Sequence, residues 1–480
     1  MRLSDLFPGE VDPAEGEELV AGLTADSRRV RPGFVFAALQ GVAADGRAFI
    51  PQAIDAGAIA VLGQALPDLP VTAIETDQPR LALAQAAGRF YPRQPDLVVA
   101  VTGTNGKSST VDFLRQIWQA AGLPAASMGT LGAIGPSGHL DLGHTTPDPV
   151  AIQGTLQALA LEGVGHVAME ASSHGLVQNR LDAVRLGAVA FTNLTQDHLD
   201  YHQTMQDYRD AKLRLFRELA PPGVPAIVNA DSDQCEVFEA AAREAGLEAV
   251  SVGWRGKDLK IEELMPRATG QRLFLSWRGT KTRVDLPLIG EFQALNALTA
   301  AGLALATGTP LDAVSLGLSR LRPVKGRLEY IGETRHGAGV FVDYAHTPAG
   351  LDVLIRAARP HTAGSLVVVF GCGGDRDRGK RPQMGAIAAR HADRVIVTDD
   401  NPRTEDAASI RAEVLAAVPH GQEIADRGEA IRQAIAGLGE NDTLLIAGKG
   451  HETGQLIGTT VIPFSDQEVA AAALREGQHD

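Results

Sequence analysis

Residues 98–110 read Val98-Val99-Ala100-Val101-Thr102-Gly103-Thr104-Asn105-Gly106-Lys107-Ser108-Ser109-Thr110. An apolar, β-branched run ends in a glycine-bounded loop, and a helical pattern follows over 111–121, which predicts strand, loop and helix. Backbone N–H groups in such a loop and the helix N-terminus favour binding of a phosphate chain. Lys107 is placed to reach the β- and γ-phosphates, and Ser108 to bring its hydroxyl to Mg²⁺. A strict Walker A motif has glycine where Val101 stands, so the alternative is an ordinary strand–helix turn with a surface lysine.

The composition is that of a soluble globular protein with more than one core. A chain of 480 residues with 44% hydrophobic and 21% charged residues predicts two to four domains. The net charge of −14 disfavours general binding to nucleic acid or membranes, so anionic ligands must be held by local basic groups. Two distant cysteines make no disulfide framework, and no apolar run suggests a signal peptide or a membrane span. We therefore expect a cytoplasmic protein.

Alternating strand and helix patterns predict three α/β domains. A small first domain is expected over 1–92, ending where the Pro-containing segment 91–95 stops a helix and begins a linker. The second, over 93–323, combines the phosphate-loop strand with further strands at 167–170, 188–192 and 225–229, which favours a largely parallel sheet. The third, over 324–480, has strands at 340–344, 365–370, 394–398 and 443–447 and predicts a doubly wound domain.

Two polar groups follow strands of the second domain. Glu170 ends an apolar strand near the phosphate loop, where a carboxylate is suited to Mg²⁺. The alternative there is a helix N-cap formed by Ser172 or Ser173. The segment 192–202 is rich in histidine and aspartate, which favours metal binding or acid–base chemistry as much as a structural role. Lys212 lies in a predicted amphipathic helix, and its local sequence alone predicts an exposed lysine.

Polar clusters also stand where strands of the third domain end. They occupy 343–346, 371–381, 399–403 and 448–452, and ligands of doubly wound domains bind at such strand ends. Arg403 in Asp400-Asn401-Pro402-Arg403 presents a planar fork suited to a carboxylate. The alternative interpretation of this turn is the N-terminus of a helix that continues into residues 404–406.

Taken together, the motifs resemble the Mur ligase family. Gly103-Thr104-Asn105-Gly106-Lys107-Ser108-Ser109 is similar to the ATP loop shared by Mur ligases and folylpolyglutamate synthetases. The segments 169–176, 197–202 and 343–348 narrow the resemblance to the Mur ligases. The segments 371–377 and 400–403 resemble the branch that makes the UDP-N-acetylmuramoyl tripeptide. The resemblance covers nearly the whole chain, in motif order.

This resemblance implies a cytoplasmic ATP-dependent amide ligase of bacterial peptidoglycan synthesis. Such an enzyme joins meso-2,6-diaminopimelate to UDP-N-acetylmuramoyl-L-alanyl-D-glutamate through an acyl phosphate, using ATP and Mg²⁺. The implied fold has an N-terminal domain for the UDP substrate, a central P-loop-type ATPase domain with a largely parallel sheet, and a C-terminal Rossmann-like domain for the amino acid. A monomer with no nucleic-acid partner and no membrane span is expected.

The resemblance also implies roles for individual residues. Those expected at ATP are Gly103, Thr104, Asn105, Gly106, Lys107, Ser108, Ser109, Asn296, Arg327 and His346. Those expected at the UDP-muramoyl dipeptide are Ser27, His144, Thr145, Thr146, Ser172, Gln178 and Arg180. Those expected at diaminopimelate are Arg376, Asp400, Asn401, Pro402, Arg403, Gly448 and Glu452. The expected catalytic groups are Lys107, Glu170, His198 and Lys212; Ser108 and Glu170 would hold one Mg²⁺, and His198 with a carbamylated Lys212 (N6-carboxylysine) the other.

Two positions depart from the family pattern. His144 stands where asparagine is frequent, and Gln293 also replaces a frequent asparagine. A folylpolyglutamate synthetase is the nearest rival, but it would lack a domain of some ninety residues before the ATP loop. A nucleotide-dependent regulator is a rival of another class, and it leaves Arg376 and the 400–403 turn unexplained.

Overall fold

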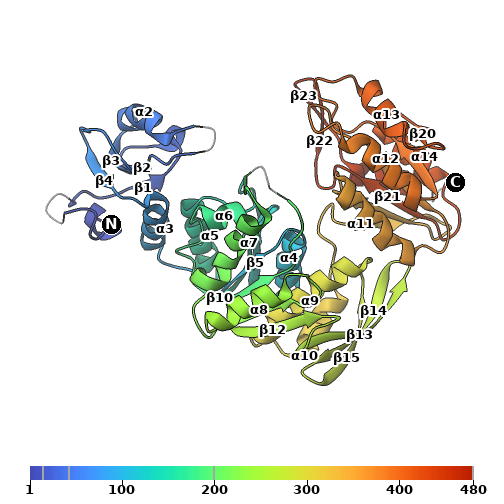
Figure 1. Cartoon of the computed structure of the whole chain (residues 1–480), viewed down its shortest axis with the longest axis horizontal. Helices are drawn as coiled ribbons and strands as arrows, with labels where there is room; N and C mark the ends of the chain where they lie inside the picture. The colour runs from blue at the N-terminus through green and yellow to red at the C-terminus, as the bar shows by residue number, and fades with distance from the viewer. Residues whose placement is uncertain (13–15, 42–43, 198–200, 478–480) are drawn as a thin grey trace. The chain divides into compact units, whose positions relative to one another are not determined.

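The computed structural model describes residues 1–12, 16–41, 44–197 and 201–477 (Figure 1). These residues form two compact units. The first comprises Met1–Lys260 with Leu298–Gly317, and the second Ile261–Ala297 with Leu318–Asp480. The first unit holds a four-stranded sheet and most of a larger sheet, and the second holds a six-stranded sheet.

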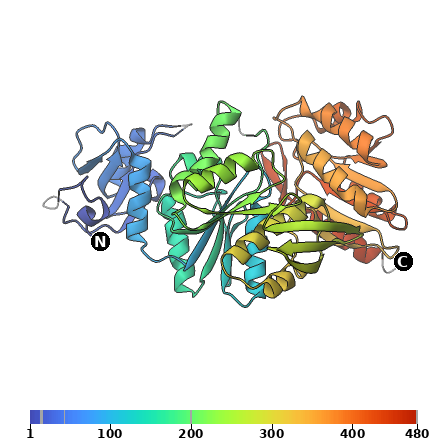
Figure 2. The same cartoon turned by 60° about the horizontal axis from the view of Figure 1, so that its bottom comes forward.

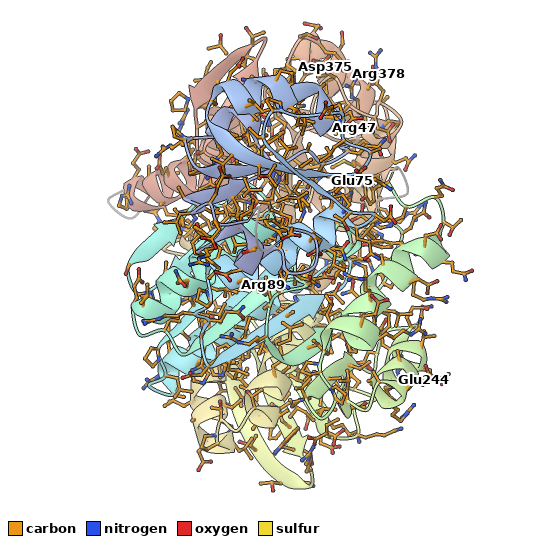
Figure 3. The ribbon with its side chains drawn as sticks, turned by 90° about the vertical axis from the view of Figure 1, so that its left-hand side faces the viewer. Arg47, Glu75, Arg89, Glu244, Asp375 and Arg378 are labelled. Atoms are coloured by element: carbon orange, nitrogen blue, oxygen red, sulfur yellow. The ribbon has the colours of Figure 1, made fainter. Side chains whose placement is uncertain are left out.

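The four-stranded sheet is parallel throughout. Its order is β1 (Gly22–Thr24), β2 (Phe34–Ala37), β3 (Ala58–Gly63) and β4 (Thr72–Glu75). The accompanying helices are α1 (Leu3–Leu6), α2 (Ile50–Asp55) and α3 (Pro79–Phe90). Buried side chains of α1 and α3 share one core with β2 and β3. Arg89, labelled in Figure 3, fastens the two helices because its Nη1 donates to the carbonyl of Leu6 (2.7 Å).

The larger sheet places the phosphate loop in its middle. Its part in the first unit runs β12 (Glu248–Gly253), β11 (Pro225–Asn229), β10 (Leu186–Phe191), β5 (Leu97–Thr102), β9 (His166–Glu170), β6 (Ala125–Gly129), β7 (Gly132–Gly135) and β8 (Gly138–Leu140). Strands β12 to β6 are parallel, and β7 and β8 are antiparallel additions at the edge. The blue-green strands of this sheet lie side by side in Figure 2. The loop after β5 is thus flanked by the ends of β9 and β10.

Burial on both faces explains why β5 reads as an unbroken apolar run. Val98 and Ala100 belong to a core completed by α5 (Pro149–Leu161), α7 (Met205–Arg214) and α8 (Cys235–Glu244). In that core the ring of Phe191 stacks on Phe238, with centroids 3.6 Å apart. Because successive side chains alternate between faces, Val99 faces the opposite layer, where it is also fully buried. Helix α4 (Lys107–Ala120), which packs on β6 and β9, starts directly at the loop.

The second unit contains a doubly wound sheet. Its order is β16 (Glu329–Glu333), β17 (Gly339–Asp343), β21 (Thr443–Ala447), β18 (Leu366–Phe370), β19 (Arg394–Val397) and β20 (Gln422–Glu423), and only β16 is antiparallel. One face packs against α11 (Pro348–Ala358), α12 (Lys380–His391) and α13 (Ala407–Leu415). The other packs against α14 (Arg427–Ala436) and α15 (Asp466–Glu476).

Three further pieces complete this unit. Strands β14 (Gly270–Trp277) and β15 (Thr280–Leu286) form an antiparallel pair beside β13 (Leu259–Arg267). Helix α9 (Glu291–Ala306) begins in this unit. A small hairpin pairs β22 (Gly454–Ile457) with β23 (Thr460–Pro463). Among the described residues, no helix has the length and apolar character needed to cross a bilayer.

The predicted α/β architecture is confirmed, and the strands expected at 98–101, 225–229 and 443–447 are all present. The sequence analysis did not anticipate the edge strands β7 and β8 or the pair β14–β15. Strand β7 is only four residues long and begins and ends with glycine, so it has too little apolar alternation to be noticed. The boundaries at 92 and 323 stay predictions.

Candidate functional site

Glycine at two positions sets the conformation of the phosphate loop. Gly103 has φ +149°, and a Cβ there would lie 1.9 Å from Thr192 Oγ1. Gly106 adopts φ +84° as the N-cap of α4. Lys107 lies across the loop, and its Nζ donates to the carbonyls of Gly103 (2.9 Å) and Thr104 (2.8 Å). The expected strand–loop–helix is therefore present, and Lys107 is the first residue of its helix.

Ser108 and Glu170 meet beside this loop. Glu170 is 2% exposed, and its Oε1 accepts from Ser108 Oγ and from the Thr130 backbone N–H, both at 2.8 Å. Gly129 leaves room for the carboxylate, because a Cβ there would lie 2.1 Å from Oε1. A hydroxyl and a carboxylate are hard oxygen donors of the kind that Mg²⁺ prefers, so the residues present fit this ion. Ser172 is the N-cap of α6 (Ser173–Val177), as the alternative interpretation expected. Glu170 takes no part in this cap, and its carboxylate bonds to Ser108 beside the loop.

Lys212 is a buried residue, so the surface-lysine alternative is wrong. It lies on α7 at 1% exposure and donates to the Gly103 carbonyl (2.9 Å), which Lys107 also uses. Its Nζ stands 4.2 Å from the centre of the Tyr208 ring. Burial, reinforced by the charge of Lys107, holds the pKa of Lys212 well below its usual range. Neutral amine is thus available at a lower pH than for an ordinary lysine.

The segment after β10 is bonded to the loop as far as the structure describes it. Thr192 Oγ1 donates to the Asn105 carbonyl (2.6 Å), and Asn193 Oδ1 accepts from the Asn105 N–H (3.0 Å). His198 lies outside the described residues. Within the described ranges, no three His, Cys, Asp or Glu side chains are grouped as metal ligands. The other histidine of the 192–202 segment, His202, is buried against the ring of Tyr208.

Four of the residues predicted to contact the muramoyl dipeptide form one connected cluster. Thr146 Oγ1 donates to the Glu170 carbonyl (2.9 Å) and accepts from the Ser172 N–H (3.0 Å). Arg180 donates to the Thr146 carbonyl and to Gln178 Oε1 (2.7 Å). The cluster is therefore bonded to the backbone of Glu170, whose carboxylate lies beside the phosphate loop.

The other three predicted dipeptide residues lie outside this cluster. Thr145 Oγ1 is 2.9 Å from Thr130 Oγ1, which itself bonds to Glu170. Ser27 begins a short 3₁₀ turn and donates to Gln52 Oε1 (3.1 Å). His144 is exposed.

The three predicted ATP residues of the second unit are linked to one another. Asn296 Nδ2 bonds to Gln293 Oε1 (3.3 Å), and Gln293 Nε2 to the Arg327 carbonyl (3.0 Å). The Arg327 guanidinium stands 4.9 Å from the centre of the Tyr344 ring. His346 Nδ1 lies 2.9 Å from the Tyr344 carbonyl oxygen. Gln293, one of the two departures from the family pattern, thus joins Asn296 to Arg327.

The turn 400–403 meets the 448–452 segment at the carboxyl ends of β19 and β21. Asn401 Nδ2 donates to Glu452 Oε2 (3.0 Å). A Cβ on Gly448 (φ +118°) would lie 2.7 Å from Asp400 Oδ2, so this glycine admits the carboxylate. Arg403 (φ +52°) donates through Nη1 to the Gly374 carbonyl (2.8 Å). Five of the seven predicted diaminopimelate residues are therefore gathered in one place, and Pro402 fixes the turn between two of them.

Arg376, the seventh, is exposed on the loop that follows β18. Arg381, which is fully buried, donates to the Gly373 carbonyl of this loop (3.3 Å) and to Glu405 Oε1 (2.8 Å), which also accepts from the Asp375 N–H (2.6 Å). Figure 3 labels two more residues of the loop, Asp375 and Arg378. Asp375 accepts from the Thr404 hydroxyl (2.8 Å), and Arg378 donates to Glu413 (2.9 Å).

Three features escaped the sequence analysis. The Thr130 backbone N–H donates to Glu170, and no pattern of side chains in the sequence predicts a backbone contact of this kind. Arg427 and Asp466 form a fully buried ion pair that spans 39 residues of sequence. Lys449 stands within a segment marked as polar, yet it is fully buried and bonded to Asn401 and Glu452. Its two flanking glycines, both at positive φ, are the signal that could have revealed an unusual turn.

The fold and the loop define a nucleotide-binding α/β protein of the P-loop type with an added doubly wound domain. Family models match three segments: the Mur ligase family catalytic domain at residues 19–98, the Mur ligase middle domain at 101–304, and the Mur ligase glutamate ligase domain at 326–450. The chain belongs to the Mur ligase family.

Individual relatives agree with this assignment. A UDP-N-acetylmuramoyl-L-alanyl-D-glutamate–2,6-diaminopimelate ligase from Agrobacterium fabrum is 50% identical over 475 residues, covering 99% of this chain and 96% of the relative. A protein of the same name from Mesorhizobium japonicum is 50% identical and covers 99% of each chain. A solved structure with that name has a TM-score of 0.78 at 31% identity, covering 100% of this chain and 99% of the other. A folylpolyglutamate synthase from Mycobacterium tuberculosis shares the fold (TM-score 0.61, 19% identity) over 83% of this chain and 94% of its own.

Proposed function

We propose that this protein is an ATP-dependent ligase that joins meso-2,6-diaminopimelate to UDP-N-acetylmuramoyl-L-alanyl-D-glutamate, with release of ADP and phosphate, in peptidoglycan synthesis. The observation that carries the proposal is the meeting of the 400–403 turn with the 448–452 segment, where Asn401 bonds to Glu452 and Asp400 lies against Gly448. An arginine fork and a carboxylate in one site match a ligand that ends in a carboxylate and an ammonium. Relatives about 50% identical over nearly the whole chain carry the name of this ligase.

The reaction has two covalent steps. A carboxylate oxygen of the dipeptide attacks the γ-phosphorus of ATP, the bond to the β-phosphate oxygen breaks, and ADP leaves an acyl phosphate behind. The amine of diaminopimelate then attacks the acyl carbon, loses a proton, and expels phosphate as the amide forms. Phosphoryl transfer depends mainly on positioning and charge neutralisation, and Lys107 supplies a positive charge at the loop. We assign the orientation of the acceptor carboxylate to Arg180, because it belongs to the cluster that bonds to the Glu170 carbonyl.

Ser108 and Glu170 would hold one Mg²⁺, and His198 with a carbamylated Lys212 a second. When bound, Mg²⁺ neutralises charge on the phosphoryl oxygens. Carbamylation forms a bond between the neutral Lys212 amine and the carbon of CO₂, with loss of one proton. The low pKa of Lys212 favours this step, because only the neutral amine is a nucleophile. The product is an anion, and the nearby Lys107 ammonium attracts it.

The remaining assignments complete the proposal. The dipeptide substrate would contact Ser27, His144, Thr145, Thr146, Ser172, Gln178 and Arg180. ATP would contact the 103–109 loop together with Asn296, Arg327 and His346. We propose three domains over 1–92, 93–323 and 324–480, in a cytoplasmic monomer that requires neither nucleic acid nor a membrane.

The test is the substrate dependence of ADP release. Purified protein should release ADP at a significant rate only when UDP-N-acetylmuramoyl-L-alanyl-D-glutamate and diaminopimelate are both present with ATP and Mg²⁺. The tripeptide product should appear in equal amount by mass spectrometry. If the rate of ADP release does not depend on either acceptor, the protein is instead a nucleotide-dependent regulator. Glutamate addition to a folate would indicate the folylpolyglutamate class.

A further inference from the structure

A buried lysine completes a closed hydrogen-bonded triangle in the second unit. Lys449 is fully buried, and its Nζ donates to Asn401 Oδ1 (2.9 Å) and Glu452 Oε2 (3.2 Å). Asn401 Nδ2 donates to the same Glu452 oxygen (3.0 Å). Each member of the triangle thus contacts both others.

The triangle fixes the orientation of Asn401. Its Oδ1 accepts from two donors, the Lys449 ammonium and the Leu456 backbone N–H (2.9 Å), whereas its Nδ2 faces a carboxylate. A flipped amide would point its NH₂ group at two donors and its oxygen at the carboxylate. Lys449, together with the Leu456 N–H and the Glu452 carboxylate, therefore selects one amide orientation.

The triangle also fixes Glu452. Both hydrogen bonds from Lys449 and Asn401 engage Oε2, and within the described residues none is recorded to Oε1. The side chain is one-third exposed, so it is reachable by a ligand. A glutamate has several rotatable bonds, and two donors on one oxygen hold it in a single rotamer with the other oxygen available as an acceptor.

The backbone explains how a lysine comes to be buried here. Gly448 and Gly450 flank it at φ +118° and +54°, so the chain turns sharply after β21 and directs the side chain inward. A Cβ on Gly450 would lie 2.6 Å from Tyr344 Cβ, which requires glycine for this approach. Burying an ammonium is costly unless it is paired, and Glu452 is its ion-pair partner.

We propose that Lys449 is a positioning residue for the amino-acid site, which orients Glu452, directly and through Asn401, toward the ammonium of diaminopimelate without touching the ligand. This inference rests on the proposed function. Under this inference, Lys449 affects the affinity for the amino acid and has no role in the reaction of ATP.

The experiment is a kinetic double-mutant cycle with Lys449→Met, Glu452→Gln and the combined variant of the full-length protein. Lys449→Met should raise the KM for diaminopimelate about ten- to a hundredfold, as expected for hydrogen bonds to a charged group. The KM values for ATP and the UDP-dipeptide should stay unchanged. The combined variant should resemble Glu452→Gln alone, because Lys449 acts through Glu452.

Two controls separate this role from folding and from the proposed function. Lys281→Met, at an exposed position on β15, should behave as wild type. If Lys449→Met does not fold, Lys449→Gln keeps a neutral donor and should show the same selective rise in KM. The inference would be overturned by a folded Lys449 variant whose KM for diaminopimelate is unchanged. It would also be overturned if the effects of the Lys449 and Glu452 substitutions on this KM were simply additive. Wild-type protein that does not use diaminopimelate at all would overturn the proposed function instead.

Discussion

Replacement of Asp466 by asparagine should destabilise the C-terminal domain strongly. Arg427 and Asp466 are both fully buried, and two hydrogen bonds of 2.7 Å join Nε and Nη2 of the arginine to the two carboxylate oxygens. Nη2 also donates to the Ala447 carbonyl at the end of β21 (3.0 Å). Asp466→Asn keeps the shape of the side chain but leaves a buried guanidinium without its counter-charge.

Removing one partner of a buried ion pair costs about 3–5 kcal/mol. For a domain of this size, that corresponds to a fall of about 6–20 °C in the melting temperature. The negative charges of Asp400 and Glu452 also act on Arg427 and offset part of the loss, so the lower half of the range is expected. Differential scanning calorimetry on the full-length protein measures the effect directly.

The chain offers a matched control for this variant. Arg272 and Asp285 form a similar two-pronged pair on β14 and β15, with contacts of 2.7 and 3.1 Å, but it is exposed to solvent. Asp285→Asn should leave the melting temperature nearly unchanged, because exposed ion pairs contribute little. Equal melting temperatures for Asp466→Asn and wild type would refute the reasoning, since they would mean that the buried arginine needs no counter-charge.

Three further predictions concern substitutions in the first unit. Lys107→Ala should reduce kcat by at least about a hundredfold through loss of charge at the transferring phosphoryl group, and a wild-type kcat at saturating substrates would exclude that role. Gly103→Ala should abolish ATP binding, measured by calorimetry, because its Cβ would clash with Thr192; unchanged binding would contradict the loop geometry. Lys212→Ala should be inactive and partly restored by short carboxylic acids, and wild type supplied with ¹³C-bicarbonate should show a carbamate signal by NMR that the variant lacks. Because the lowered pKa keeps Lys212 neutral over more of the pH range, this signal should persist below pH 10.5, where an ordinary lysine is protonated. Full activity without any carbamate signal would count against the modification.

Hydrophobic patterning was sufficient to predict the parallel sheets, since β5, β18 and β21 are buried on both faces and read as continuous apolar runs. The phosphate loop was predictable because its glycines and lysine are adjacent in sequence. Short strands such as β7 and the hairpin β22–β23 were not, because their pairing comes from contacts with neighbouring strands and not from their own periodicity.

Burial of charged side chains was the part of the site least accessible to sequence analysis. Lys212 reads as a surface residue of an amphipathic helix, yet it lies against the loop of a strand more than a hundred residues earlier. Likewise, Lys449 meets Asn401, and Arg427 meets Asp466, only when distant segments come together. Charged residues are seldom fully buried, so sequence analysis places them at the surface unless a known motif suggests otherwise.

The measurement that tests the proposed function most directly is the ratio of kcat/KM for meso-diaminopimelate to that for L-lysine, which lacks one carboxylate. A site that pairs this carboxylate with Arg403 should discriminate by about 10⁴ or more, because L-lysine leaves the charge of Arg403 unpaired in the occupied site. Arg403→Ala should lose most of the preference through the KM for the amino acid. Equal kcat/KM values for the two amino acids in the wild-type protein would contradict the proposal.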